Sequence, residues 1–126
     1  MGVVLIAEGD PQVLALAESY LQEHGHQTLS ASTPAQALAL VNRTQEQLDV
    51  LFTDIGLTDD PHAGLDLAIQ AVERRPGLKV LYTTGLPVTD GMKALFVEGA
   101  ALLEKPYTVD QLLTTLVVHF GMRPKS

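Results

Sequence analysis

Asp49-Val50-Leu51-Phe52-Thr53-Asp54 is the stretch that decides the fold of this 126-residue chain. A strand that is buried on both faces of a parallel sheet is a continuous apolar run, and this run ends in a carboxylate. In open α/β sheets, ligands and chemistry collect outside the carboxyl ends of the strands. The stretch therefore predicts a central strand that places Asp54 at the functional edge of a sheet.

Other apolar runs also lead into polar residues. Residues 3–7 are followed by Glu8, residues 79–83 by Thr84 and Gly85, and residues 101–103 by Glu104 and Lys105. A short further strand is expected over residues 27–31. Because the carboxyl ends of parallel strands lie at one edge, we expect two acids, a hydroxyl and a lysine to meet there.

Amphipathic segments alternate with these runs, which is typical of a parallel sheet with helices on both faces. Asp10-Pro11 is a helix start signal, and Thr108 with Gln111 forms a capping box before the last helix. A fourth helix is expected from Thr89 or Asp90 to near Gly99. The sequence thus predicts a doubly wound five-stranded parallel sheet with five helices.

The composition of the chain excludes several classes of function. The formal net charge is −7, and the eight Lys and Arg residues are scattered, so direct nucleic-acid binding is not expected. Cysteine is absent, which excludes disulfides and thiolate chemistry. With no apolar run of about 20 residues, we expect no membrane span and a cytoplasmic protein. The domain is expected over residues 1–122, with a short tail at 123–126.

The ordered set Glu8, Asp54, Thr84-Gly85 and Lys105-Pro106-Tyr107 resembles the receiver domain of two-component response regulators. The resemblance covers essentially the whole chain. It implies the CheY-like, flavodoxin-like fold with strand order 2-1-3-4-5. The segment 51–54 and the long loop before Gly64 resemble receivers of hybrid histidine kinases in particular.

The resemblance also implies roles. Asp54 would accept a phosphoryl group from a histidine kinase or a histidine phosphotransfer protein. Thr84 would hydrogen-bond that group, and Lys105 would pair with one of its oxygens. Mg²⁺ would be held by Glu8, Asp54 and the backbone carbonyl of Gly56. The peptide bond between Lys105 and Pro106 would be cis.

Partner contacts follow from the same resemblance. A downstream protein would bind the face of the fourth helix, fifth strand and fifth helix, to which Val88, Phe96 and Tyr107 would contribute. A homodimer is a further expectation. The chain could act as a stand-alone regulator, as a phosphate shuttle, or as part of a larger kinase.

Two departures from the family pattern affect function. Receivers place two adjacent acids after the first strand, but here Gly9 takes the second place, so Mg²⁺ binding is expected to be weak. Asp10 is a further candidate ligand, although capping the helix at Pro11 is its favoured role. Leu102 replaces the aromatic residue that often switches conformation in the family.

Three alternatives stay open. A degenerate receiver would bind partners without phosphorylation, which Gly9 favours. The segment 54–58 also resembles the aspartate motif of haloacid-dehalogenase-like phosphatases, but Gly56 stands where that family has a second acid. A flavodoxin-like nucleotide binder is the least favoured, because no glycine-rich phosphate loop follows the first strand.

Overall fold

The computed structural model describes residues 2–43, 45 and 47–123. Apart from Arg123, the predicted tail lies outside the described residues. The chain forms one parallel sheet in the order β2-β1-β3-β4-β5, as the sequence predicts. The strands are β1 (Val3–Ala7), β2 (Gln27–Ala31), β3 (Val50–Asp54), β4 (Lys79–Thr84) and β5 (Ala101–Glu104).

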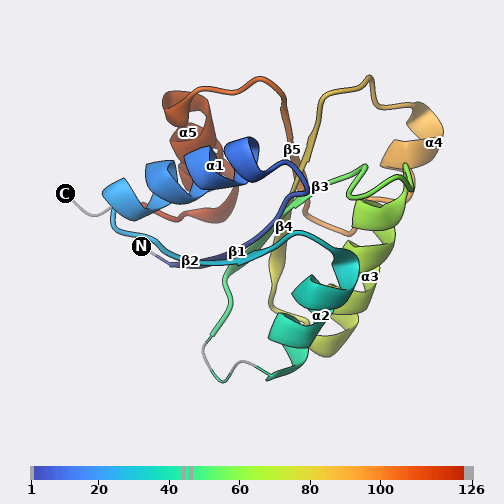
Figure 1. The fold of residues 1–126 in the computed structure, drawn as a ribbon, viewed down its shortest axis with the longest axis horizontal. Helices are drawn as coiled ribbons and strands as arrows, with labels where there is room; N and C mark the ends of the chain where they lie inside the picture. The colour runs from blue at the N-terminus through green and yellow to red at the C-terminus, as the bar shows by residue number, and fades with distance from the viewer. Residues whose placement is uncertain (1, 44, 46, 124–126) are drawn as a thin grey trace.

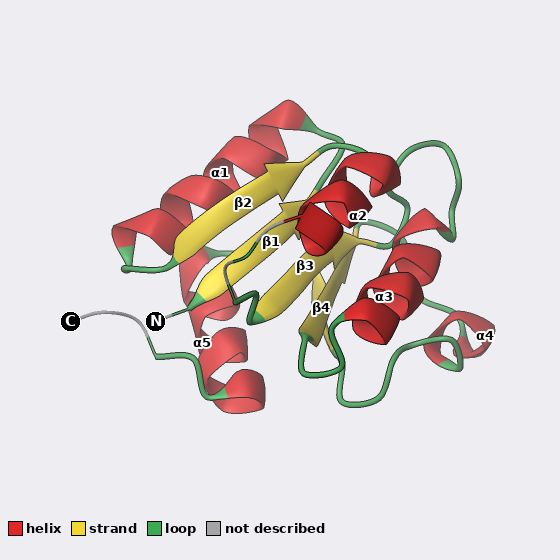
Figure 2. Cartoon of the chain, turned by 90° about the horizontal axis from the view of Figure 1, so that it is seen from below, coloured by secondary structure: helices red, strands yellow, loops and turns green. Residues whose placement is uncertain are grey.

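Helices cover both faces of this sheet (Figures 1 and 2). One face is covered by the first and last helices, and the other by the three between them. The helices are α1 (Pro11–Glu23), α2 (Pro34–Arg43), α3 (Ala63–Arg74), α4 (Asp90–Lys93) and α5 (Val109–Phe120). This is the predicted doubly wound arrangement.

The strand that decides the fold supplies side chains to both layers of the core. Val50 and Phe52 belong to the apolar cluster under α1 and α5, whereas Leu51 belongs to the cluster under α2 and α3. All three are essentially inaccessible to solvent. Successive side chains of a strand point to opposite faces, so a strand buried on both sides has to be apolar throughout.

Two predicted helix starts are confirmed in detail. The Asp10 carboxylate accepts hydrogen bonds from the backbone amides of Gln12 and Val13. At α5, the Thr108 hydroxyl accepts from the amide of Gln111, whose side chain in turn accepts from the Thr108 amide. Each cap satisfies backbone donors that the first turn of a helix leaves free.

The prediction of a long fourth helix is wrong, because α4 ends at Lys93. The amides of Leu95 and Phe96 bond to carbonyls three residues earlier, which is the pattern of tight turns. The amide of Val97 donates to the Tyr82 hydroxyl at 3.1 Å. This tertiary bond takes a donor that a continuing helix would have used internally.

The start of α3 lies directly against the end of β3. A β-carbon built on Gly64 would lie only 1.9 Å from the backbone oxygen of Asp54, so only glycine fits there. The Gly64 amide donates to the carbonyl of Ile55 at 2.8 Å. Gly64 therefore allows α3 to hold the backbone that carries Asp54.

Gly64→Ala should destabilise the fold by about 2 kcal/mol or more, because the clash is with backbone rather than with a movable side chain. Gly77→Ala is the matched control, since a β-carbon there meets nothing within 4 Å. Urea denaturation of both variants measures the difference. Equal stabilities would contradict the close packing of α3 on β3.

Candidate functional site

Three charged side chains meet at the carboxyl edge of the sheet. The Lys105 ammonium nitrogen lies 2.6 Å from Oε1 of Glu8 and 3.2 Å from Oδ2 of Asp54. Glu8 follows β1, Asp54 ends β3 and Lys105 follows β5. The Lys105 amide also donates to the carbonyl of Thr84 at 2.9 Å, which ties the end of β5 to β4. The peptide bond between Lys105 and Pro106 is cis.

These groups are largely shielded from water. Only 5% of the Glu8 side chain, 16% of Asp54 and 20% of Lys105 is exposed. Burial lowers the pKa of Lys105, but its hydrogen bond to Glu8 and the charges of both carboxylates outweigh burial and raise that pKa above its usual value. The lysine is therefore a fixed positive charge at neutral pH.

The Glu8 carboxylate has a partner on each oxygen. Oε1 pairs with Lys105, and Oε2 accepts from the backbone amide of Asp10 at 3.1 Å. The Asp10 carboxylate itself caps α1, as the sequence favoured. Glu8 is thus fixed at the site by two hydrogen bonds.

Asp54 and Thr84 line the same cleft, which has a volume of about 260 Å³. Oδ1 of Asp54 accepts from the Gly56 amide at 3.3 Å. The Thr84 hydroxyl is bonded within its own turn: it donates to the carbonyl of Leu86 at 3.2 Å and accepts from the Leu86 amide at 3.1 Å. A group bound to Asp54 would therefore lie in a cleft that also holds a hydroxyl.

The donor atoms fit a hard cation such as Mg²⁺ in kind. Two carboxylates, Glu8 and Asp54, share one ammonium, and Gly56 adds a backbone carbonyl two residues after Asp54. Over the described part of the chain, no three acidic or histidine side chains gather as a metal cluster. Mg²⁺ keeps several of its waters when it binds, so a small set of protein oxygens is compatible with it.

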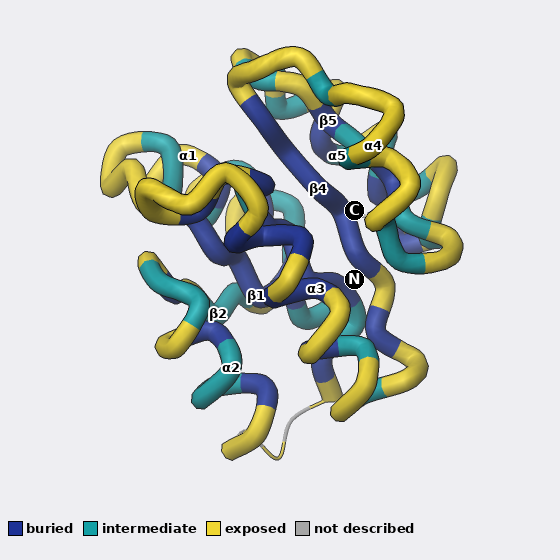
Figure 3. Tube along the Cα trace, turned by 90° about the vertical axis from the view of Figure 1, so that its right-hand side faces the viewer, coloured by how far each residue is buried: buried dark blue, intermediate teal, exposed yellow. Residues whose placement is uncertain are grey.

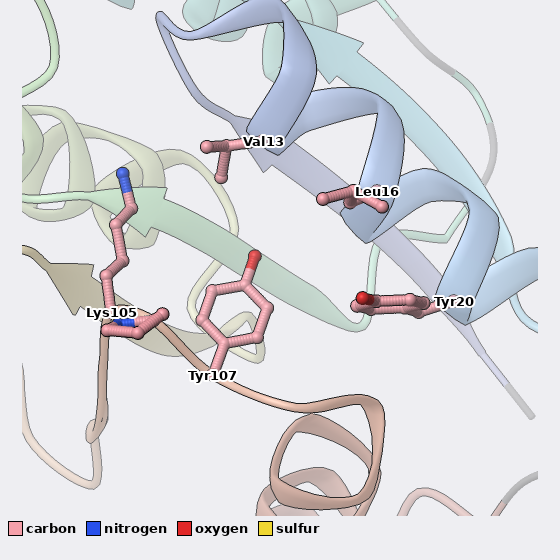
Figure 4. Close-up of a pocket in the computed structure, with 6 residues that line it drawn as sticks. Val13, Leu16, Tyr20, Lys105 and Tyr107 are labelled. Carbon is pink, nitrogen blue, oxygen red and sulfur yellow. The ribbon is translucent and has the colours of Figure 1, made fainter.

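A smaller cleft of about 160 Å³ lies between α1 and the segment from Lys105 to Tyr107 (Figure 4). The Tyr107 ring forms one wall of this cleft, and Val13, Leu16 and Tyr20 of α1 line it as well. Its centroid lies 5.7 Å from that of Phe52. Burial, with smaller contributions from nearby acidic groups, raises the pKa of Tyr107 to about 12.

The structure divides the predicted partner residues between two faces. Val88 and Phe96 pack against the core under α2 and α3, whereas Tyr107 packs against the core under α1 and α5. The Tyr107 ring lies against Phe52, on the opposite side of the sheet from Val88 and Phe96. That these three residues contribute to a partner face of α4, β5 and α5 stays a prediction.

Two residues of the site region escaped sequence reasoning. Gly64 is required by its contact with the Asp54 backbone, but in the sequence it is only a glycine at the end of a loop. Tyr82 is fully buried in β4 and uses its hydroxyl to hold Val97. A tyrosine inside a buried strand could have signalled this, because a buried phenol needs a hydrogen-bond partner.

The fold and site together define a class, and comparisons with known proteins agree. Residues 4–117 match the model of the response regulator receiver domain family. The "Alginate biosynthesis transcriptional regulatory protein AlgB" of Pseudomonas syringae pv. tomato is 30% identical over 112 residues, which cover 88% of this chain and 24% of that protein. The chain thus spans about a quarter of that relative.

Solved structures show the same fold. A CheY-like receiver domain protein from Methanospirillum hungatei JF-1 superposes with a TM-score of 0.81 at 26% identity, over 92% of this chain and 90% of that one. A receiver protein from Sinorhizobium medicae WSM419 gives a TM-score of 0.78 at 28% identity, over 89% and 88%.

This chain belongs to the response regulator receiver domain family of two-component signalling. Receiver domains are signalling modules that interact with histidine kinases or phosphotransfer proteins and with downstream effectors, and they generally bind Mg²⁺ at the phosphorylation site. The phosphatase and nucleotide-binder alternatives fall outside this family. In the described residues, no helix is long and apolar enough to cross a membrane.

Tyr107 should make the fold sensitive to alkaline pH. Its pKa is about 12 in the folded chain against a usual value of 10.0, so its contribution to stability is complete below pH 10 and is lost as the pH rises toward 12. Tyr107→Phe should reduce this alkaline loss by about 2 kcal/mol. Urea denaturation between pH 9 and pH 12 tests it, and the same variant at pH 7 is the control. An unchanged alkaline profile would contradict the burial of this phenol.

Proposed function

We propose that this chain is a phosphoacceptor, and that Asp54 takes a phosphoryl group from the phosphohistidine of a histidine kinase or a phosphotransfer protein. The observation that carries the proposal is the pairing of Asp54 with Lys105 at 3.2 Å, at the edge of a cleft that also contains Thr84. Phosphoryl transfer needs an aligned nucleophile and positive charge near the transferring oxygens, and this site has both.

In this step, a carboxylate oxygen of Asp54 forms a bond to phosphorus while the bond from phosphorus to the imidazole nitrogen breaks. The electron pair of the broken bond stays on the imidazole, which leaves as a neutral ring after taking a proton from solvent. Lys105 moves its hydrogen bond from Asp54 to a phosphoryl oxygen. The Thr84 hydroxyl donates to another oxygen once it gives up the carbonyl of Leu86.

A bound Mg²⁺ would neutralise charge on the phosphoryl oxygens, and Glu8, Asp54 and the Gly56 carbonyl are the groups that would hold it. We propose that this binding is weak. Gly9 contributes no side chain, Asp10 is engaged at the start of α1, and Glu8 already pairs with Lys105. Beside the Lys105 ammonium, the cation would meet two carboxylates rather than three.

A second candidate is a degenerate receiver that binds partners without phosphorylation. The distance from Lys105 to Glu8 is shorter than that from Lys105 to Asp54, so the lysine pairs more closely with Glu8 than with the proposed phosphoacceptor. In such a module, the Glu8–Lys105 pair would fix one permanent conformation of the edge.

The remaining proposals concern context. We propose that residues 1–122 form the receiver unit, that it works in the cytoplasm, and that it signals through the face of α4, β5 and α5. Its resemblance to receivers of hybrid histidine kinases stays a prediction. The transcriptional role in the printed name of AlgB belongs to a protein about four times as long.

Intact-mass spectrometry with acetyl phosphate or phosphoramidate and Mg²⁺ tests phosphorylation. The parent chain should gain a single phosphoryl adduct, and Asp54→Ala should gain none because the nucleophile is gone. Asp59→Ala is the matched control, since this exposed acid lies in the neighbouring loop and outside the cleft. No adduct on the parent, with a small donor and with a histidine kinase, would favour the degenerate receiver.

Gly9→Asp should tighten Mg²⁺ binding by about tenfold, because it adds a carboxylate beside the site. The position accepts a side chain: a β-carbon on Gly9 would meet only the carbonyl of Ser32, at 3.9 Å. Calorimetric titration with Mg²⁺ measures the affinity. Gly9→Asn is the control of equal size without the charge, and an equal affinity of parent and Gly9→Asp would overturn the weak-site proposal.

A further inference from the structure

Between β4 and β5 the chain is held only loosely. From Gly85 to Ala100 every residue is described and none is fully buried, whereas the last four residues of β4 are all buried (Figure 3). Within this stretch we call residues 86–97 the strap. It includes α4, which is a single turn. Segments with few buried contacts open at low free-energy cost, so specific bonds decide how the strap is held.

The first end of the strap is fastened by the last residue of β4. The Thr84 hydroxyl both donates to and accepts from the backbone of Leu86, with lengths of 3.2 and 3.1 Å. The side chain of Leu86 is 74% exposed and adds little packing of its own. This end therefore depends on a hydroxyl that also lines the cleft beside Asp54.

The second end is fastened by Tyr82, two residues earlier on the same strand. Its hydroxyl accepts the amide of Val97 at 3.1 Å, and its ring centroid lies 4.3 Å from that of Phe96. Tyr82 is fully buried, while Phe96 and Val97 are half-buried and pack on the same core. The contact thus joins the half-buried end of the strap to a residue in a fully buried part of β4.

The strap also forms a wall of the cleft. Three of its residues, Leu86, Pro87 and Met92, line the cleft together with Asp54, Gly56 and Pro61. Any displacement of the strap changes the shape of the space beside Asp54. A bond that holds the strap therefore acts on the reaction site from a distance.

We propose that Tyr82 is a positioning residue, whose hydroxyl holds the end of the strap at Val97 and so keeps this wall of the Asp54 cleft in place. It does so also when the Thr84 hydroxyl releases Leu86 to bind a phosphoryl group on Asp54. The release of Leu86 by Thr84 rests on the proposed phosphorylation of Asp54. Two hydroxyls of one strand hold the two ends of one segment, so a change at Thr84 frees one end while Tyr82 limits the movement at the other.

Hydrogen exchange of the unphosphorylated chain, followed by NMR or mass spectrometry, tests the fastening directly. Tyr82→Phe keeps the ring against Phe96 and removes only the hydroxyl, so the Val97 amide should exchange about fivefold faster, the effect of losing one hydrogen bond. Amides of β1 and β3 should be unchanged. Tyr20→Phe is the matched control, because it removes a hydroxyl from α1, away from the strap. Exchange at Val97 equal to that of the parent would overturn the proposal.

Phosphorylation adds a second readout. Intact mass first establishes whether the phosphoryl adduct forms. If no adduct forms, the proposed function is contradicted, but the hydrogen-exchange result on the unphosphorylated chain still tests the role of Tyr82. On the phosphorylated parent, exchange should accelerate at Leu86 while Val97 stays protected; on phosphorylated Tyr82→Phe, the whole strap should exchange faster. Equal acceleration at both ends of the parent would show that Tyr82 does not restrain the far end.

The consequence for the reaction is also measurable. With acetyl phosphate as donor, Tyr82→Phe should raise the concentration needed for half-maximal labelling more than it lowers the maximal rate, because a loose wall affects donor positioning and leaves Asp54 and Lys105 in place. A purely structural role would lower the amount of folded protein without moving that concentration. An unchanged concentration in Tyr82→Phe, at full folding, would contradict the positioning role.

Discussion

The Lys105 ammonium, shared by the carboxylates of Glu8 and Asp54, is the interaction on which this edge of the molecule depends. Two carboxylates this poorly exposed would be costly to keep ionised without a counter-ion. The sheet supplies that ion from β5, two strands from the end of β3. The bond from the Lys105 amide to the Thr84 carbonyl fixes where the lysine leaves the sheet. The order of the strands therefore also places the cation beside the two carboxylates that it neutralises.

The surroundings of Asp54 are unequal in stiffness. On one side, Gly64 brings α3 into direct contact with the backbone of Asp54, where any β-carbon would clash. On the other side lies the strap, which contains no fully buried residue and is fastened by two hydroxyls of β4. If a group is added to Asp54, α3 has little room to move, because its backbone already contacts that of Asp54. The strap is the element that can respond to it.

Most of the fold was predictable from the sequence because its signals are local and repeated. Continuous apolar strands and caps such as Asp10 and Thr108 each depend on a few neighbouring residues. The ends of the strands also placed Glu8, Asp54 and Lys105 together correctly. The prediction failed over residues 94–99, where an apolar pattern of helical spacing was overridden by the tertiary bond from Val97 to Tyr82. Likewise, the need for Gly64 arises from a contact between distant segments and leaves no local pattern.

The same geometry explains how one missing acid can weaken a metal site without removing it. Glu8 has a partner on each oxygen, but a carboxylate offers about four acceptor positions, so its two bonds leave room for a cation. Mg²⁺ fills unoccupied positions with water. What Gly9 removes is therefore negative charge more than donor atoms. At this poorly solvated edge, Lys105 already offsets one of two carboxylates, so a missing third acid leaves less charge to attract a divalent ion. We therefore expect a lower Mg²⁺ affinity at a site whose coordination geometry remains attainable.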